Sequence, residues 1–191
     1  MELCLVNNDP THTLLITSDG VPAYSINTHA NSAQGSSVEN VDILKTTQVT
    51  RLERRSTGKT ETEVGKILHF GIDRLRLTLH STERKVFKLE IMDFQGFGEL
   101  AESGSTAWSF TGPDDKPYKW QIFIHYPVLF VNDNSQTPLA RYRRAKLGIV
   151  SRPRRASLEI LPAGINCIDF IVTTFVSYMI QRFPPITTAT Q

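Results

Sequence analysis

The sequence predicts a mainly β protein, in which a large antiparallel β-barrel of about 12 strands surrounds a buried, hydrophobic C-terminal α-helix. Short apolar runs, many with alternating apolar and polar residues, recur roughly every 8–15 residues through most of the chain. Residues 165–183, near the C-terminus, are apolar on most sides and contain no proline or glycine. Because side chains alone cannot fill a barrel of well over eight strands, such a helix is suited to occupy the interior.

Three short apolar runs open the chain and are separated by turn signals. The cluster Asn7-Asn8-Asp9-Pro10 lies between the first two runs, and Asp19-Gly20 lies between the second and the third. In the third run Tyr24 and Ile26 alternate with polar residues, which is typical of a half-buried strand. The pattern predicts an opening hairpin with strands at residues 3–6, 14–16 and 23–28.

The middle of the chain contains four further strand candidates. In the clearest of them Leu75, Leu77 and Leu79 share one face, and such period-two patterns mark antiparallel strands with one buried face. The charged segment 54–62 is expected to be an exposed hairpin tip, and the small polar residues 31–40 a poorly ordered loop. The four strands are expected at residues 47–52, 64–70, 74–79 and 86–91.

Five strand candidates lie between this region and the C-terminal helix. Gly112-Pro113-Asp114-Asp115 reads as the turn of a hairpin between the first two. The aromatic residues on both sides of the turn alternate so that they share one face, and an inward face in the core is favoured over an aromatic binding surface. These residues include Trp108, Phe110, Tyr118 and Trp120. The strands are expected at residues 107–111, 118–125, 128–131, 139–142 and 157–161.

Residues 165–183 are predicted to form the central helix. Gly164 precedes them and Pro184-Pro185 follows, which suits a helix that ends there. The polar residues step by three or four, so they form one narrow stripe on an otherwise apolar surface, and such a helix is normally buried nearly all round. The stripe consists of Asn166, Asp169, Thr173, Ser177 and Gln181.

The same segment is long enough to cross a membrane, so a C-terminal membrane anchor is the alternative. Asp169 opposes an anchor, because an acidic residue near the centre of a bilayer costs about 2.5–3.5 kcal/mol. The simpler prediction is one domain over residues 1–183, with its central helix at about 165–183. A short tail at residues 184–191 follows it and is expected to be poorly ordered.

The cations of the chain are unevenly distributed, although its net charge is only +2. Between positions 141 and 155 there are seven cations and no acidic residue, and the rest of the chain is net acidic. Such a run is often only a solvated loop. The functional alternative is an anion site, because guanidinium groups bind phosphate in a bidentate manner and cations favour an anionic membrane surface. The candidate phospholipid-binding residues are Arg141, Arg143, Arg144, Lys146, Arg152, Arg154 and Arg155.

Other features point away from common catalytic and metal sites. Cys4 and Cys167 are too few for a disulfide framework, and the five histidines lack the close spacing of a zinc site, so neither metal nor cofactor is expected. Gly58-Lys59-Thr60 resembles the end of a phosphate-binding loop, but Glu53 stands where that motif requires glycine. The sequence also lacks a serine-nucleophile elbow. Because a secretory signal is absent, the expected location is intracellular and cytoplasmic, peripheral to a membrane.

Five short motifs, in order along the chain, resemble a known family. The central motif is Phe110-Thr111-Gly112-Pro113-Asp114 followed by Tyr118-Lys119-Trp120, and the others are residues 3–10, 139–142, 157–162 and 169–175. They resemble the fungal family catalogued as domain of unknown function 6593, which is more distantly similar to the tubby C-terminal and phospholipid scramblase group. The resemblance implies a twelve-stranded barrel around a buried C-terminal helix. Asp115 departs from the family pattern, which has glycine at the turn.

The wider group implies phosphoinositide binding, membrane-proximal roles and transcriptional regulation, but analogy of fold does not establish function. The leading hypothesis is a non-enzymatic intracellular binding or scaffold module that recognises anionic phospholipid headgroups at a membrane surface. The alternative is a small-molecule hydrolase or transferase whose site assembles only in the fold. A flat basic patch would favour the module, and a deep pocket lined by converging polar groups would favour the enzyme. Nucleic acid is not an expected partner, because no recognition helix accompanies the cations.

Overall fold

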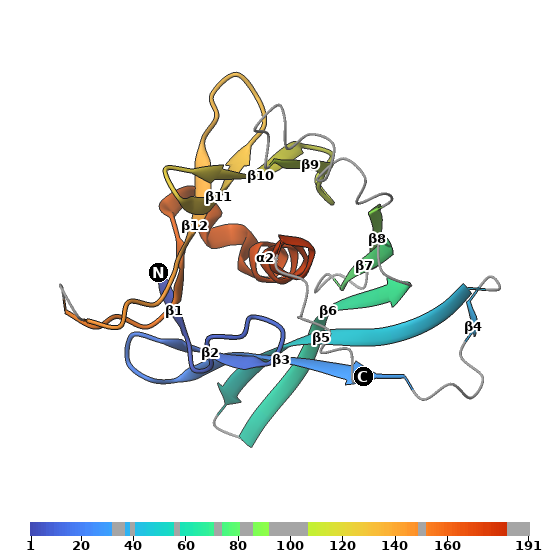
Figure 1. Cartoon of the computed structure of the whole chain (residues 1–191), viewed down its shortest axis with the longest axis horizontal. Coiled ribbons are helices and arrows are strands. Elements are labelled where there is room, and N and C mark those ends of the chain that lie inside the picture. Colours follow the sequence, from blue (N-terminus) through green and yellow to red (C-terminus); the bar gives the residue numbers. More distant parts are fainter. Residues whose placement is uncertain are drawn as a thin grey trace, which may run out of the picture.

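One antiparallel β-sheet curves around a C-terminal helix, α2, which lies on its concave side (Figure 1). The computed structural model describes residues 1–31, 37–38, 41–55, 58–70, 74–80, 86–91, 107–148 and 152–182. The strands are β1 (Glu2–Leu5), β2 (Thr13–Thr17), β3 (Pro22–Ala30), β4 (Ser37–Val38), β5 (Val41–Arg55), β6 (Gly58–Phe70), β7 (Arg74–His80), β8 (Val86–Ile91), β9 (Trp108–Thr111), β10 (Pro117–Phe123), β11 (Tyr126–Val131), β12 (Pro138–Arg143) and β13 (Ser157–Ile160). The 3-10 helix η2 (Pro162–Cys167) and α2 (Ile168–Arg182) follow.

The N-terminal strand joins the two halves of the sheet. The strand order is β8-β7-β6-β5-β3-β2-β1-β13-β12-β11-β10-β9, and the short β4 pairs with β5 outside this path. Strand β1 therefore lies between β2, its neighbour in sequence, and β13, near the other end of the chain. The N-terminal ammonium group of Met1 also donates a hydrogen bond to the carbonyl oxygen of Ile160 at 2.9 Å. Pairing of the chain ends thus produces one continuous sheet from two meanders.

The predicted mainly β fold with a buried C-terminal helix is confirmed, whereas the predicted closure of the barrel is not seen. Strands β8 and β9 form the two edges of the sheet, and no residue in the described parts of β8 pairs with β9. The described residues therefore form an open, curved sheet. Closure requires a ladder of hydrogen bonds between these edges, and hydrophobic alternation within each strand carries no information about that pairing.

Each strand that the sequence predicts is present, but β5 and β6 extend well beyond the predicted segments. They pair from Ile43 opposite Phe70 to Arg55 opposite Gly58, with two register shifts. The end of this hairpin nearest its tip, from Glu53 to Glu63, is polar. The sequence there lacks the alternation of apolar and polar residues that would have indicated a strand. The predicted tip at 54–62 contains the end of β5 and the start of β6, where Arg55 pairs with Gly58. Within the predicted loop 31–40, β4 pairs with β5, while 32–36 and 39–40, like the tail 184–191, lie outside the described residues.

The predicted helix is present and begins as a 3-10 helix at Pro162. At Gly164 an added Cβ would collide with the carbonyl oxygen of Leu139, so glycine lets η2 cross β12 closely. From Phe170 to Gln181 every residue of α2 is buried. The prediction of a largely buried helix surrounded by antiparallel strands is confirmed, although its predicted last residue, 183, lies outside the described residues.

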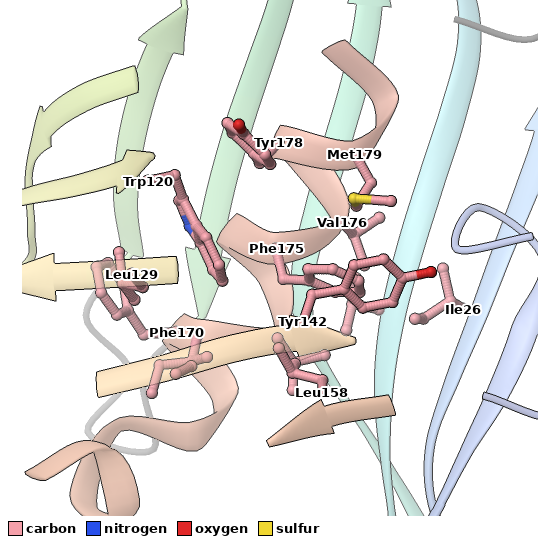
Figure 2. Close-up of a cluster of buried hydrophobic side chains, with 14 of the residues drawn as sticks. Ile26, Trp120, Leu129, Tyr142, Leu158, Phe170, Phe175, Val176, Tyr178 and Met179 are labelled. Carbon is pink, nitrogen blue, oxygen red and sulfur yellow. The ribbon is translucent and has the colours of Figure 1, made fainter. Parts of the chain in front are cut away.

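Aromatic side chains from α2 and the sheet form much of the core (Figure 2). Phe175 lies 5.1 Å from Tyr142 and 6.0 Å from Trp120 between ring centroids, and Trp120 also stacks on Tyr178 at 5.6 Å. The sequence-based assignment of the alternating aromatic residues to the core is confirmed. Trp108, Phe110, Tyr118 and Trp120 are all buried.

The buried polar stripe of α2 satisfies its hydrogen-bonding groups largely within the helix. The hydroxyl group of Thr173 donates to the carbonyl oxygen of Asp169 at 2.8 Å, and that of Ser177 donates to the carbonyl oxygen of Thr173 at 3.0 Å. A Cβ at Gly65 of β6 would overlap the Thr173 side chain, so glycine there lets β6 approach the helix closely. Thr173 and Ser177 therefore permit close packing with their hydroxyl groups satisfied, whereas the buried Nε2 of Gln181, in the same stripe, has no hydrogen-bond partner among the described residues.

The structure favours a core helix over the membrane anchor. By length and composition alone, residues 162–182 would be able to cross a membrane. In the structure, however, the sheet already covers most of this segment, and its apolar side chains contact other parts of the same chain.

We expect replacement of Phe175 by alanine to lower the free energy of unfolding by about 3–5 kcal/mol, because a fully buried aromatic side chain leaves a cavity when it is removed. Urea denaturation measures this change. Phe123→Ala is the matched control, because Phe123 is 55% exposed and its removal should cost much less. Equal effects of the two substitutions would contradict the central position of α2.

Candidate functional site

Five of the seven candidate cations lie on the connection from β12 to β13. We call this connection, residues 144–156, the basic arm; its residues 149–151 lie outside the described part of the chain. The backbone NH of Lys146 donates to the carbonyl oxygen of Arg154 at 2.8 Å, and the NH of Arg154 donates back at 3.1 Å. This antiparallel bridge holds the two sides of the arm together, and in Figure 1 the arm extends away from α2.

The other two cations share one carboxylate on the outer face of the sheet. Arg141 lies opposite Glu159 in the register of β12 and β13 and donates to it from Nε at 2.6 Å and from a terminal nitrogen at 3.1 Å. A terminal nitrogen of Arg143 lies 2.9 Å from the same carboxylate. The hydrogen bond from Arg141 and the two positive charges lower the pKa of Glu159 despite its partial burial. Arg141 and Arg143 are therefore weaker candidates for binding an external anion.

The five cations of the basic arm differ in their surroundings. Arg154 is half-buried and donates a hydrogen bond from its guanidinium group to the carbonyl oxygen of Arg144 at 3.2 Å, so it helps to hold the arm together. The side chains of Arg144, Lys146, Arg152 and Arg155 are exposed. Leu147, next to Lys146, is 89% exposed. The arm thus combines four exposed cations with an exposed apolar side chain.

A cavity of about 960 Å³ lies at the N-terminal end of α2. Strands β3, β5, β6, β7 and β8 contribute to one side of its wall, and the β9–β10 turn together with η2 and the first turn of α2 contributes to the other. The cavity is therefore located where the two edges of the sheet approach the start of the helix. None of the described residues of the basic arm lines it.

Asp169, in the first turn of α2, is the central charged group of this cavity. It accepts a hydrogen bond from the hydroxyl group of Tyr24 at 2.7 Å and one from a terminal nitrogen of Arg51 at 2.6 Å. Arg51 Nε also lies 2.9 Å from a carboxylate oxygen of Glu53. Burial, and then the hydrogen bond to Asp169, raise the pKa of the Tyr24 hydroxyl group, so Tyr24 remains a neutral donor.

A second carboxylate, Asp114, reaches the cavity from the β9–β10 turn. It accepts a hydrogen bond from the Tyr118 hydroxyl group at 2.9 Å and pairs with Lys116 at 3.3 Å. Burial acts to raise the pKa of Asp114, but these hydrogen bonds outweigh it and the pKa is lowered. Asp115, where the family pattern has glycine, has a φ of 59°, in the left-handed region that favours glycine. The turn therefore keeps the conformation that glycine would adopt.

The cavity does not contain an activated nucleophile among its described residues. Burial raises the pKa of the Cys167 thiol, with a further contribution from Asp114, so the reactive thiolate is disfavoured. His80 lies 3.7 Å from the carboxylate of Glu63. Within the described ranges, no group of three His, Cys, Asp or Glu side chains is arranged to hold a metal ion. The arrangement is suited to binding a ligand by charge and hydrogen bonds.

Sequence reasoning identified the cations of the basic arm but missed this cavity. The one available signal was Asp169, an acidic residue in an apolar helix, which must find a partner when it is partly buried. Its partners Arg51 and Tyr24 lie 118 and 145 positions away in the chain, a separation that no local pattern reveals. The Gly58-Lys59-Thr60 segment, in contrast, begins β6 opposite the end of β5, as expected for a hairpin tip.

These features define a class of β protein in which an open sheet surrounds a C-terminal helix and carries a cationic arm and a cavity at the start of the helix. The chain belongs to the Family of unknown function (DUF6593), whose model matches residues 8–182. The predicted family membership is thereby confirmed. The relationship to the tubby and scramblase group stays a prediction.

No curated protein matches the sequence. Among solved structures, that of a protein from Arabidopsis thaliana is similar over 93% of this chain and 88% of its own length, with 13% sequence identity and a TM-score of 0.42. A likeness at this level carries no information about function.

We expect Asp169→Ala to lower the free energy of unfolding by about 1–3 kcal/mol, because it leaves Arg51 and Tyr24 without their carboxylate in a partly buried site. A double-mutant cycle with Arg51→Met, measured by urea denaturation, isolates the coupling. We expect a coupling of about 0.5–3 kcal/mol. Strictly additive effects would show that the two side chains do not stabilise one another.

Proposed function

We propose that the protein is a non-enzymatic intracellular binding or scaffold module that associates with membrane surfaces through its basic arm. In this proposal the ligands are the anionic headgroups of phospholipids, and the protein is cytoplasmic and peripheral to the membrane. The observation that supports it most strongly is the group of exposed cations on an arm that extends away from the helix.

The charge of the arm is largely uncompensated. Lys146, Arg152 and Arg155 form no ion pair with any acidic residue in the described part of the chain. Each cation near an anionic leaflet contributes about 1 kcal/mol, so four exposed cations contribute roughly 4 kcal/mol. That free energy corresponds to weak, roughly millimolar association, which suits reversible attachment.

Leu147 offers an apolar contribution to the same interaction. Its side chain is 89% exposed and adjoins Lys146, so insertion at the boundary between headgroups and acyl chains would remove it from water. Full burial of a leucine side chain contributes about 1.5–3 kcal/mol. Together, the cations and Leu147 would give association of roughly 5.5–7 kcal/mol, within reach of a vesicle-binding experiment.

The proposal includes the wider relationship that the family motifs imply. We propose that the sheet belongs to the same architecture as the tubby C-terminal and scramblase group, in which a closed barrel surrounds the helix. Two facts support this: the strands surround a C-terminal helix, and the two edges, β8 and β9, follow one another in the chain. The fungal origin that the motifs imply belongs to the same proposal.

A small-molecule hydrolase or transferase is the second candidate function, because the cavity at the start of α2 brings converging polar groups together. Such a pocket is the feature that favours an enzyme over a flat basic surface. The Cys167 thiol, however, has a raised pKa and donates a hydrogen bond to the carbonyl oxygen of Gly164 at 3.5 Å. The cavity therefore supports ligand binding better than nucleophilic catalysis.

Vesicle co-sedimentation tests the proposed function. The variant Lys146→Ala/Arg152→Ala/Arg155→Ala should bind phosphatidylserine-containing vesicles roughly a hundredfold more weakly than the parent protein, because three contributions of about 1 kcal/mol are lost. Binding of the parent protein should also weaken with added salt, since these contacts are screened over about 8–10 Å near physiological ionic strength. The melting temperature should remain nearly unchanged.

A matched variant controls for net charge. Lys45→Ala/Arg54→Ala/Lys59→Ala removes the same number of cations from exposed positions on β5 and β6, and it should retain most of the vesicle binding. The proposal is wrong if the parent protein ignores anionic vesicles at low salt, or if both variants lose binding equally.

A further inference from the structure

The cavity at the start of α2 takes no part in the proposed membrane association, because none of its lining residues belongs to the basic arm. Its volume of about 960 Å³ lies within the range of roughly 300–1,000 Å³ that is typical of pockets for small molecules. A cavity of this size with a mixed lining is a candidate ligand site in its own right.

Apolar residues form the wall and the mouth of this cavity. Val64, Leu79 and Phe170 line it and are buried. Val86 and Ile165 also line it but are 58% and 43% exposed, so they mark the place where the cavity meets solvent. An apolar mouth and an apolar wall favour a ligand with an apolar body.

The polar part of the lining is acidic. In the described part of the chain, and apart from His80, the charged groups that line the cavity or pair with its lining comprise more acids than cations. The acids are Asp169, Asp114, Glu53 and Glu63, and the cations are Arg51 and Lys116. Each cation is already paired with a carboxylate. A ligand with an anionic head would therefore be repelled.

Asp169 has hydrogen-bonding capacity left for a ligand. Each of its oxygens accepts one hydrogen bond from the protein, from Tyr24 or from Arg51, and a carboxylate oxygen can accept two. The Asp169 side chain also lines the cavity and is 28% exposed, so a donor inside the cavity can reach it.

We propose that this cavity is a binding site for small amphipathic molecules that combine an apolar body with an amine head, and that the ammonium group binds Asp169. The apolar body lies against Val64, Leu79 and Phe170 and enters between Val86 and Ile165. Charge sets the order of preference among ligands with the same apolar body: an amine binds most tightly, an alcohol less tightly and a carboxylate least. The site is independent of the basic arm, whose charge is opposite.

Three probes with one common tail test this order. Octylamine, 1-octanol and octanoate are added to the full-length Cys4→Ser protein, in which Cys167, a lining residue, is the remaining thiol. Binding is measured as protection of Cys167 from methyl methanethiosulfonate and, independently, by calorimetry. We expect octylamine to bind on the order of tenfold more tightly than octanoate, with 1-octanol in between.

Charge substitutions at the exposed mouth residue Ile165 test the same electrostatic argument without disturbing the core. Relative to 1-octanol binding, Ile165→Glu should tighten octylamine binding several-fold and Ile165→Lys should weaken it by a similar factor. The two variants should bind 1-octanol equally, because both lose the same apolar contact. Asp169→Asn, in protein shown by circular dichroism to be folded, should remove the preference for the amine. The Ile165 variants should bind anionic vesicles as the parent does, and the arm variant should bind octylamine as the parent does.

Two results would overturn the proposal. One is that none of the three probes protects Cys167 or releases heat up to its solubility limit. The other is loss of the order set by charge, seen either as octanoate binding as tightly as octylamine or as both Ile165 variants shifting octylamine binding, relative to 1-octanol binding, in the same direction.

Discussion

Helix α2 is buried on every side between Phe170 and Gln181, and this burial is the constraint on which the rest of the structure depends. A helix without a solvent-facing side must be covered all round, and a flat sheet can cover only one side. Pairing of β1 with β13 makes the required curved sheet continuous. Close approach is possible because Gly65 faces Thr173, whose hydroxyl group is satisfied within the helix.

The candidate site lies where the sheet stops covering helix α2. Strands β8 and β9 are the edges of the sheet, and the cavity lies where these edges approach the first turn of α2. At that point the helix carries Asp169 in place of an apolar residue, with Arg51 and Tyr24 as its partners. The basic arm has a different origin, because it is a connection between two strands that leaves the sheet. The molecule therefore separates a cationic surface from an acidic cavity.

Much of the fold could be predicted from local patterns, and much of the site could not. Alternation of the kind seen at Leu75, Leu77 and Leu79 identified the half-buried strands, because their side chains alternate between core and solvent. The polar far half of the β5–β6 hairpin gave no such signal. The seven cations were recognisable as a cluster, but the pairing of Arg141 with Glu159 depends on the register of two strands. The cavity depends on contacts between residues more than 100 positions apart.

Native-state hydrogen exchange of the backbone amides of α2 tests the central claim most directly. If the sheet can surround α2 only as a complete unit, the amides between Phe170 and Gln181 should exchange only by global unfolding, with opening free energies equal to that measured by urea denaturation. Exchange of these amides through a local opening of much lower free energy, while β5 and β6 remain protected, would show that the sheet is stable without the helix and would contradict the account.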